Sequence, residues 1–491
     1  MKRHGKIGAA VFLLMTGTLY SIFSNERICR DSVEDDMSKS AKHSPPVHDN
    51  ATRCFLDLQK QLNDHEIDKW IKADVPIVEK VFRLERVWII LLDVEHLHHE
   101  TIKGGRHKNF WLADGGVQWY WQNGNNTSLA CVTNALTDDP HVSVLSCPNP
   151  NNDNDRSANP ILWAMNATPT AHVDTHKKPL VTYNLTKFHA CEALETKAWH
   201  QRRNPQNVSL GACTMWRDVS PLQIHEWIAY HRMIGVERFW LYQNEPFWSQ
   251  RKKRRQNKND AFLWASLALM DDVTMIPYYN FHHRRVKNSP PNHPSNFSFW
   301  QEPMQFQCLY RAKKYQVDWI ITTDLDEFIW VGNSNNQPAT RQSRPLLREL
   351  LHELEMTHPN IKDVGAFEMN SIPYRRNVHF DPPQHLPLDY TWRTAQPLDA
   401  RERDGVKLIY QVEVARAIGR HELWKGGKTF QLQPSTQAHV RRFKETTAPI
   451  PNDLIRDSEL FDAYHIPVLE ELQNQTSIAY NENEISRVQR Q

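Results

Sequence analysis

The sequence predicts an α/β fold in which residues 206–450 form a mostly parallel, Rossmann-like sheet covered by helices, preceded by a β-rich accessory domain over residues 55–205. Two successive strand–helix–strand patterns between residues 210 and 325 predict the parallel sheet. Short β-rich runs divided by turns predict the earlier domain. The length of 491 residues and the hydrophobic content of 40% allow two or three globular domains.

The first strand–helix–strand unit carries clear start and stop signals for its helix. Residues 210–216 form a buried apolar run, and residues 221–235 carry apolar side chains at helical spacing. Ser220 is placed to cap this helix, Pro221 stands at its first position, and Gly235 ends it. Since strands joined by a single helix run parallel, the unit predicts a parallel sheet.

The second unit ends in an acidic motif. A strand at 273–276 and a helix over 301–315 lead to an apolar run that stops at Asp324-Leu325-Asp326. Because side chains alternate along an extended strand, Asp324 and Asp326 should leave one face while Leu325 points into the core. Paired hard oxygens suit Mg²⁺ or Mn²⁺, which can bind a diphosphate. A chance Asp-x-Asp in an acid-rich chain is the alternative.

The carboxyl ends of the strands predict where a ligand binds. In open α/β sheets, ligands lie in the crevice beyond these ends. The ends here are residues 216–218, residues 243–245 and the acidic motif. Since the sequence has no glycine-rich phosphate loop, metal and side chains would hold the phosphates of a nucleotide.

The N-terminus predicts a membrane anchor. Residues 7–23 are an uncharged run of 17, after a basic tail at 1–6 and before an acid-rich segment, which places the following chain in the lumen. A cleaved signal peptide is the alternative, although the flanking residues make a poor cleavage site. Residues 24–54 are polar and are interpreted as a stem. Residues 451–491 are interpreted as an exposed helical tail.

Sequons and cysteines indicate a secretory compartment. The seven cysteines include no Cys-x-x-Cys pair, so disulfides are expected rather than zinc. Leaving out Cys29, the six others allow 15 pairings, among which the sequence does not choose. Cys29 would join two chains into a homodimer, with a free thiol as the alternative. Asn-x-Ser/Thr sequons begin at Asn50, Asn125, Asn126, Asn166, Asn184, Asn207, Asn296 and Asn474.

The overall charge gives no sign of nucleic acid binding. There are 59 Lys and Arg against 57 Asp and Glu, a net charge of +2, so no nucleic-acid partner is expected. The basic run at 251–255 is interpreted as a solvated loop; an acidic partner or anionic headgroups are the alternatives.

The motifs of residues 210–445 resemble those of glycosyltransferase family 92. The resemblance rests on residues 213–244, which include Glu226-Trp227-Ile228-Ala229-Tyr230-His231, on 305–311 with Cys308, and on the Asp-x-Asp-Glu-Phe block at 319–328. Lys407-Leu408-Ile409, His421 and His439 are similar to the closing segment of the family.

This resemblance implies a GT-A fold and a single-pass type II Golgi membrane protein with a lumenal catalytic domain. It also implies a UDP-hexose donor, galactose in known members, a glycan acceptor, dependence on Mn²⁺ or Mg²⁺, and inversion to a β-linkage. The acceptor hydroxyl would attack C1 while the metal offsets the charge on the departing diphosphate. Asp324 and Asp326 are assigned to the metal, with His421 or His439 completing its coordination. A structural histidine is the alternative for each.

Further residues are assigned to the nucleotide sugar. Trp216 and Asn244 would flank the nucleoside, with a core position as the alternative for Trp216. Asp324 would also contact the donor. Arg217 and Lys407 would contact phosphate, and an ordinary surface cation is the alternative for both.

Inversion needs one carboxylate near the acceptor as a general base. Glu368 is assigned as this base, in preference to Glu402 and Asp404, because it is expected at the end of a strand at 364–369.

The sequence leaves two other functions open for this protein. A non-catalytic glycan-binding protein would keep the fold and bind glycans without releasing UDP. A metal-dependent phosphodiesterase would use the paired acids to hydrolyse a nucleotide without an acceptor.

Overall fold

The structure is a computed structural model, described here for the residues within its second compact unit, Asn50–Gln491. The predicted cytosolic tail and anchor lie outside the described residues. Among the helices that are described, none is long and apolar enough to cross a membrane. The described residues are 77–83, 87–93, 117–123, 127–134, 142–148, 161–166, 179–185, 209–216, 219–243, 263, 267, 270, 272–277, 295–332, 346–358, 360–375, 392–394, 405–443 and 454–456.

The first described strands form two four-stranded antiparallel sheets, with orders β1-β2-β6-β5 and β4-β3-β7-β8. These strands lie within residues 55–205, and their grouping into a separate accessory domain stays a prediction. A disulfide joins Cys131 to Cys147 in β6. The strands are β1 (Ile77–Arg83), β2 (Val87–Asp93), β3 (Val117–Asn123), β4 (Thr127–Ala130), β5 (Val132–Asn134), β6 (Val142–Pro148), β7 (Ile161–Asn166) and β8 (Val181–Asn184).

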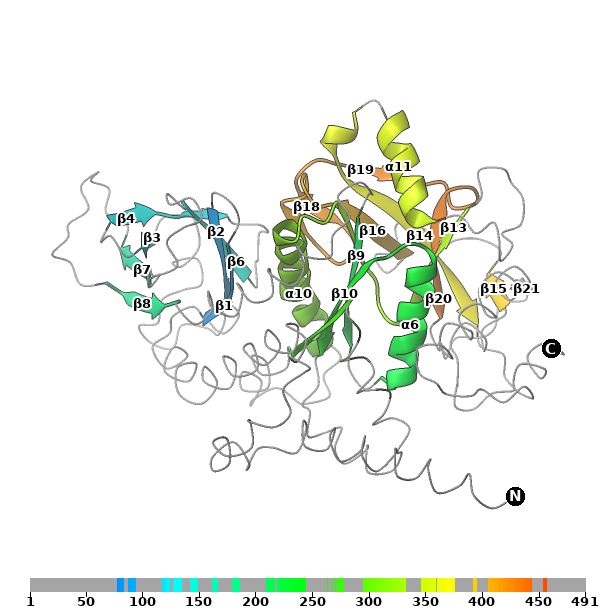
Figure 1. Cartoon of the computed structure of the whole chain (residues 1–491), viewed down its shortest axis with the longest axis horizontal. Helices are drawn as coiled ribbons and strands as arrows, with labels where there is room; N and C mark the ends of the chain where they lie inside the picture. Colours follow the sequence, from blue (N-terminus) through cyan, green and yellow to red (C-terminus); the bar gives the residue numbers. More distant parts are fainter. Residues whose placement is uncertain are drawn as a thin grey trace, which may run out of the picture. The chain divides into compact units, whose positions relative to one another are not determined.

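An 11-stranded sheet follows and carries the candidate site (Figure 1). Its order along the main path is β11-β10-β9-β12-β16-β14-β15-β21. The strands are β9 (Leu210–Trp216), β10 (Arg238–Gln243), β11 (Val273–Pro277), β12 (Trp319–Thr322), β13 (Glu327–Val331), β14 (Val364–Arg375), β15 (Trp392–Thr394), β16 (Val406–Gln411), β19 (Lys428–Gln431), β20 (Ala438–Phe443) and β21 (Leu454–Arg456). A two-stranded sheet comprises β17 (Ala417–Ile418) and β18 (Leu423–Lys425).

The sheet contains both parallel and antiparallel neighbours, so the expectation of a mostly parallel sheet holds for only part of it. Strands β11, β10, β9 and β12 are parallel neighbours, as the two strand–helix–strand units predict. Beyond β12, strand β16 runs antiparallel to β12, and β14 runs antiparallel to β16. Parallel neighbours need a crossover connection, whereas antiparallel strands can pair without one. The short strand β21 also replaces part of the helical tail expected after residue 450.

Helices cover both faces of this sheet. Helix α6 (Pro221–Met233) and helix α11 (Leu347–Thr357) contribute to one buried apolar cluster, and helix α10 (Ser295–Lys314) contributes to another. Phe367 and Ile409 belong to the first cluster, while their strand neighbours Ala366 and Leu408 belong to the second. Because neighbouring strand residues point to opposite faces, α6 and α11 lie on one face and α10 on the other. A short 3₁₀ helix (Ile361–Asp363) precedes β14.

A buried disulfide ties α10 to the sheet. Cys213 in β9 is bonded to Cys308 in α10, and both residues are inaccessible to solvent. The sequence left this pairing open among 15. Since α10 also supplies a side chain to the acidic motif, the bond holds that helix beside the site.

The predicted start of α6 is confirmed as a capping box. Ser220 Oγ accepts from Gln223 N at 3.2 Å, and Ser220 N donates to Gln223 Oε1 at 3.1 Å. Gly235 follows the helix with φ +99°, a conformation that glycine adopts readily. Local signals alone therefore define both ends of this helix.

Ser220→Ala should lower the free energy of unfolding by about 1 kcal/mol, because it leaves a helical N–H without its acceptor. Urea unfolding measures this difference. Ser220→Asp is the matched control, since a carboxylate oxygen also accepts from the first turn. The capping role is contradicted if the alanine and aspartate variants unfold at the same urea concentration.

Candidate functional site

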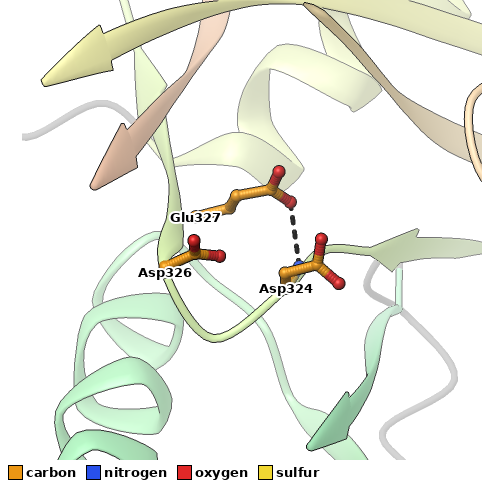
Figure 2. Close-up of side chains that lie close together, drawn as sticks. All are labelled: Asp324, Asp326 and Glu327. Carbon is orange, nitrogen blue, oxygen red and sulfur yellow. Dashed lines mark hydrogen bonds between the residues drawn. The ribbon is translucent and has the colours of Figure 1, made fainter. Parts of the chain in front are cut away.

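The acidic motif lies on a tight turn between β12 and β13 and not on an extended strand. Glu327 N donates to Asp324 O at 3.0 Å, and Asp324 N donates to Glu327 Oε2 at 2.9 Å (Figure 2). Phe443 N donates to Asp326 O at 2.7 Å. The expectation that strand alternation brings the two aspartates to one face is therefore wrong, because the turn does this instead. Leu325 is buried in the core, as predicted.

Three carboxylates converge at this turn. One oxygen from each of Asp324, Asp326 and Glu327 lies within 4.8 Å of the others. Asp324 and Asp326 are half-buried, whereas Glu327 is fully buried. Sequence reasoning missed Glu327 as a member of the cluster, although it directly follows the motif. The donor set of hard oxygens fits Mg²⁺ or Mn²⁺.

Helix α6 fixes the strand that begins at this turn. Trp227 Nε1 donates to Glu327 O at 3.2 Å, and Tyr230 OH donates to Ile329 O at 3.0 Å. Both donors are buried on the face of α6 that packs against β13. The carboxylates are thus placed by rigid elements of the fold.

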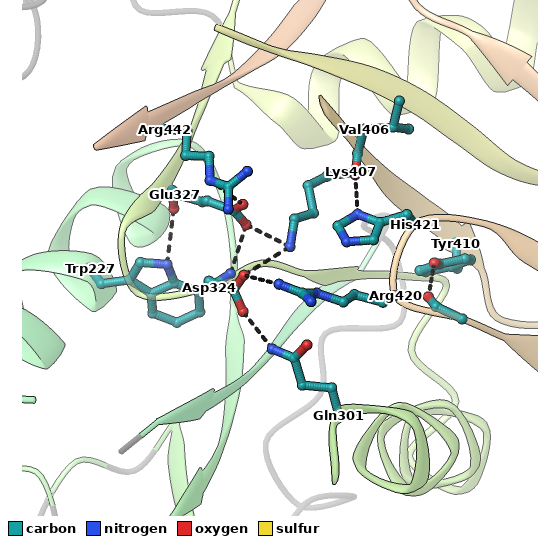
Figure 3. A network of polar contacts seen from close by, with 11 residues as sticks. Trp227, Gln301, Asp324, Glu327, Val406, Lys407, Tyr410, Arg420, His421 and Arg442 are labelled. Carbon is teal, nitrogen blue, oxygen red and sulfur yellow. Dashed lines mark hydrogen bonds and ion pairs between the residues drawn. The ribbon is translucent and has the colours of Figure 1, made fainter. Parts of the chain in front are cut away.

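Three cations lie around Asp324 and Glu327 (Figure 3). Lys407 Nζ lies 3.1 Å from Asp324 Oδ2 and 2.9 Å from Glu327 Oε2. Arg442 Nε lies 3.8 Å from Glu327 Oε1, and Arg420 lies 3.8 Å from Asp324 Oδ2. Three carboxylates and three cations cancel in formal charge, so a bound divalent cation would leave a net positive site. Such a site attracts an anionic ligand such as a diphosphate.

An amide from α10 completes the environment of Asp324. Gln301 Nε2 donates to Asp324 Oδ1 at 3.0 Å, and the Gln301 residue is almost fully buried. No local feature of the sequence singles out this glutamine, since it lies 23 residues before its partner. Its hydrogen bond holds the carboxylate in one orientation.

The two aspartates differ in acidity. Burial alone would raise the pKa of Asp324, but the charges of Lys407 and Arg420 overcome it and hold that pKa below its usual value. For Asp326, burial together with the neighbouring Glu327 and Asp324 carboxylates raises the pKa to about 7. Asp324 is therefore ionised at neutral pH, and Asp326 changes its charge there.

The affinity for Mn²⁺ should fall by about tenfold for each pH unit below about 7, because a proton on Asp326 competes with the metal. Thermal shift titrations with MnCl₂ across this pH range measure the affinity.

The stability of the metal-free fold also depends on this carboxyl group. Without metal, Asp326 of the folded chain holds its proton between about pH 4 and about pH 7, whereas the same residue of the unfolded chain does not. The carboxyl therefore stabilises the metal-free fold at the acidic end, and this contribution is lost as pH rises through about 7. An affinity for Mn²⁺ that does not change with pH would contradict the assignment of Asp326 to the metal.

The two predicted histidines lie in different places. His421 Nδ1 donates to Val406 O at 2.7 Å, which puts the lone pair of the neutral ring on Nε2, an arrangement typical of metal-binding histidines. Figure 3 shows this ring beside Lys407. His439 Nδ1 likewise donates to a carbonyl, Pro434 O, at 2.7 Å, and its ring stacks on Trp330 with ring centroids 4.6 Å apart.

Strand alternation explains the position of His439. It lies three residues before Arg442 in β20, so its side chain leaves the opposite face of the strand. Arg442 faces Glu327, and His439 faces away from it. In the part of the chain that the structure describes, the cluster of metal-capable groups comprises acids only, with neither histidine within its 4.8 Å limit.

The structure does not bring Glu368 to the acidic turn. The expected strand end at residue 369 is wrong, because β14 continues beyond it to Arg375. Glu368 pairs with Leu408, and Met369 pairs with Lys407, so Glu368 and Lys407 leave opposite faces of the sheet. Partial burial raises the pKa of Glu368. Its role as a general base stays a prediction.

Of the two residues expected to flank the nucleoside, the structure describes Trp216. Trp216 is 1% exposed and belongs to the core cluster beneath α6, which favours the alternative of a core position. Trp216 pairs with Gln243, so the carboxyl ends of β9 and β10 meet at one edge of the sheet. Arg217 and Asn244 follow these ends but lie outside the described residues.

The fold and the acidic turn define an α/β protein with a candidate site for a divalent cation at the end of a sheet strand. The chain belongs to glycosyltransferase family 92, whose family model matches residues 206–483. This match confirms the resemblance seen in the motifs.

Two plant relatives carry the same family description. A glycosyltransferase family 92 protein of Ricinus communis is 28% identical over 253 residues, which are 50% of this chain and 37% of the relative. A glycosyltransferase family 92 protein of Arabidopsis thaliana is 22% identical over 215 residues, 44% of this chain and 31% of the relative. The matches thus span about a third of the length of these curated relatives.

Proposed function

We propose that this protein is a metal-dependent inverting glycosyltransferase with GT-A organisation, which moves a hexose from a UDP-sugar to a glycan acceptor. Membership of glycosyltransferase family 92 supports sugar transfer. The observation that carries the metal dependence is the convergence of Asp324, Asp326 and Glu327 at the carboxyl end of β12. Galactose is the proposed donor sugar, because the resemblance of the motifs implies it.

Transfer of the hexose from a UDP-sugar requires that the site stabilise a leaving diphosphate. Asp324, Asp326 and Glu327 would hold Mn²⁺ or Mg²⁺, which supplies Lewis-acid stabilisation of the charge that develops there. Lys407 balances the negative charge of the acids, and Gln301 orients Asp324. The acceptor hydroxyl would then lose its proton to a carboxylate, for which Glu368 remains the proposal.

A screen for UDP release tests the proposal. UDP-hexoses are combined with glycan acceptors in the presence of Mn²⁺, and UDP is measured. We expect UDP release only when both donor and acceptor are present, with loss of release in EDTA. Formation of UMP and hexose 1-phosphate without an acceptor would favour a phosphodiesterase. Glycan binding that persists in EDTA, with no UDP release from any donor, would favour a glycan-binding protein.

A Golgi location is part of the same proposal. The uncharged run at 7–23 supports a type II anchor, and the sequons support a lumenal catalytic domain. Asn184 lies on an exposed strand end, where a glycan can be accommodated. Digestion with a glycosidase should therefore shift the mass of the secretory-pathway protein, and Cys29→Ser tests the proposed homodimer on a non-reducing gel.

A further inference from the structure

Lys407 is poorly placed to receive a phosphate. Its side chain is only 2% exposed, and its ammonium group lies against both Asp324 and Glu327. Opposite charges on both sides satisfy this cation within the protein. A phosphate oxygen would have to compete with two carboxylates for it.

Arg420 is the more open of the cations near the turn. Its side chain is 31% exposed, and its polar contact among the described residues is one long ion pair of 3.8 Å to Asp324 Oδ2. Its Nε is buried and has no hydrogen-bond partner in the described part of the chain, so the exposed part of the side chain lies elsewhere on it. A guanidinium presents five N–H donors in a planar fork that matches a phosphate, so most of its hydrogen-bonding capacity is unused.

The turn that carries Arg420 is anchored on both sides. Before it, Tyr410 OH donates to Gly419 O at 2.7 Å. After it, His421 Nδ1 donates to Val406 O at 2.7 Å. Both anchors belong to β16, the strand that also carries Lys407.

Packing at Gly419 tightens the same turn. A Cβ added at Gly419 would lie 2.6 Å from the Trp424 ring, so the backbone approaches that ring closely. Gly419 N also donates to Glu422 O at 2.8 Å. Because the backbone on both sides of Arg420 is fixed, its side chain is presented toward the acidic turn with little ordering left to do on binding.

We infer that Arg420 is the specificity-determining cation that binds the diphosphate of the donor, whereas Lys407 is an internal counter-ion of the acidic turn. This inference rests on the proposed function. It reassigns the phosphate contact expected of Lys407 to a residue that no motif singled out. The arginine would reach the phosphate from the open side, and the metal-binding carboxylates would keep their buried partner.

Binding of UDP and UMP in the presence of Mn²⁺ tests the inference by calorimetry. Arg420→Met should weaken UDP binding by about 10-fold to 100-fold, because a charge-assisted hydrogen bond to phosphate is lost. It should weaken UMP binding less and so reduce the preference for UDP over UMP. Arg420→Lys should recover part of the loss, since it restores the charge without the planar fork.

Arg416→Met is the matched control, because Arg416 is exposed and lies on the segment just before the anchored turn. It should leave both affinities unchanged. If the wild type binds UDP and Arg420→Met binds it as well as Arg416→Met does, the inference is wrong and the proposed function stands. If the wild type binds no UDP with any divalent cation, the proposed donor fails, and the inference fails with it.

Discussion

Asp326→Asn is expected to lower metal-dependent UDP release by about 10²-fold or more. The substitution removes one negative charge from the carboxylates proposed to hold the metal, which would stabilise the leaving diphosphate. The amide keeps the size of the side chain but offers a neutral oxygen in place of a carboxylate. Asp326 is one of three acids whose oxygens lie within 4.8 Å of one another. Measurements at about pH 8, above the pKa of about 7, ensure that the wild-type carboxyl is ionised.

The same variant has a readout that does not depend on activity. Mn²⁺ should raise the melting temperature of the wild type and have a much smaller effect on Asp326→Asn, because binding to the folded state shifts its stability. Asp363→Asn is the control, since Asp363 is exposed in the 3₁₀ helix before β14. Equal Mn²⁺ stabilisation of both variants would remove Asp326 from the metal site.

The parts of the fold that sequence predicts well have local causes. Strand β9 and helix α6 match their expected positions because an apolar run, a capping serine and a terminal glycine all act within a few residues. Such signals need no knowledge of the remaining chain.

The turn at the acidic motif has a distant cause, which is why alternation failed there. Strand β13 follows β12 in the chain but pairs with β20, so that Glu327 lies opposite Arg442. The partner is more than a hundred residues away in sequence, and nothing near Asp324 reports it. The predicted end of β14 is wrong for a similar reason, since its last residues pair with β15 and β20.

Buried charge explains the site residues that sequence reasoning missed. A fully buried glutamate is unusual unless it is paired, so Glu327 could be expected in the cluster only by knowing the position of Lys407. Arg420 and Gln301 likewise join the site through contacts across the fold. The Asp-x-Asp spacing identifies the correct location, and the tertiary structure supplies the surrounding charges.

Lys407→Met should lower the free energy of unfolding in EDTA by about 3–5 kcal/mol, because removing one partner leaves buried carboxylate charge without compensation. Added Mn²⁺ should restore more stability to this variant than to the wild type, since the cation offsets the same charge. Urea unfolding with EDTA or Mn²⁺ measures both effects. Lys428→Met, at an exposed position in β19, is the control and should change little. If Lys407→Met is as stable as this control in EDTA, Lys407 is not the counter-ion that holds the acids together; if only the extra Mn²⁺ stabilisation is missing, the acids do not bind the metal.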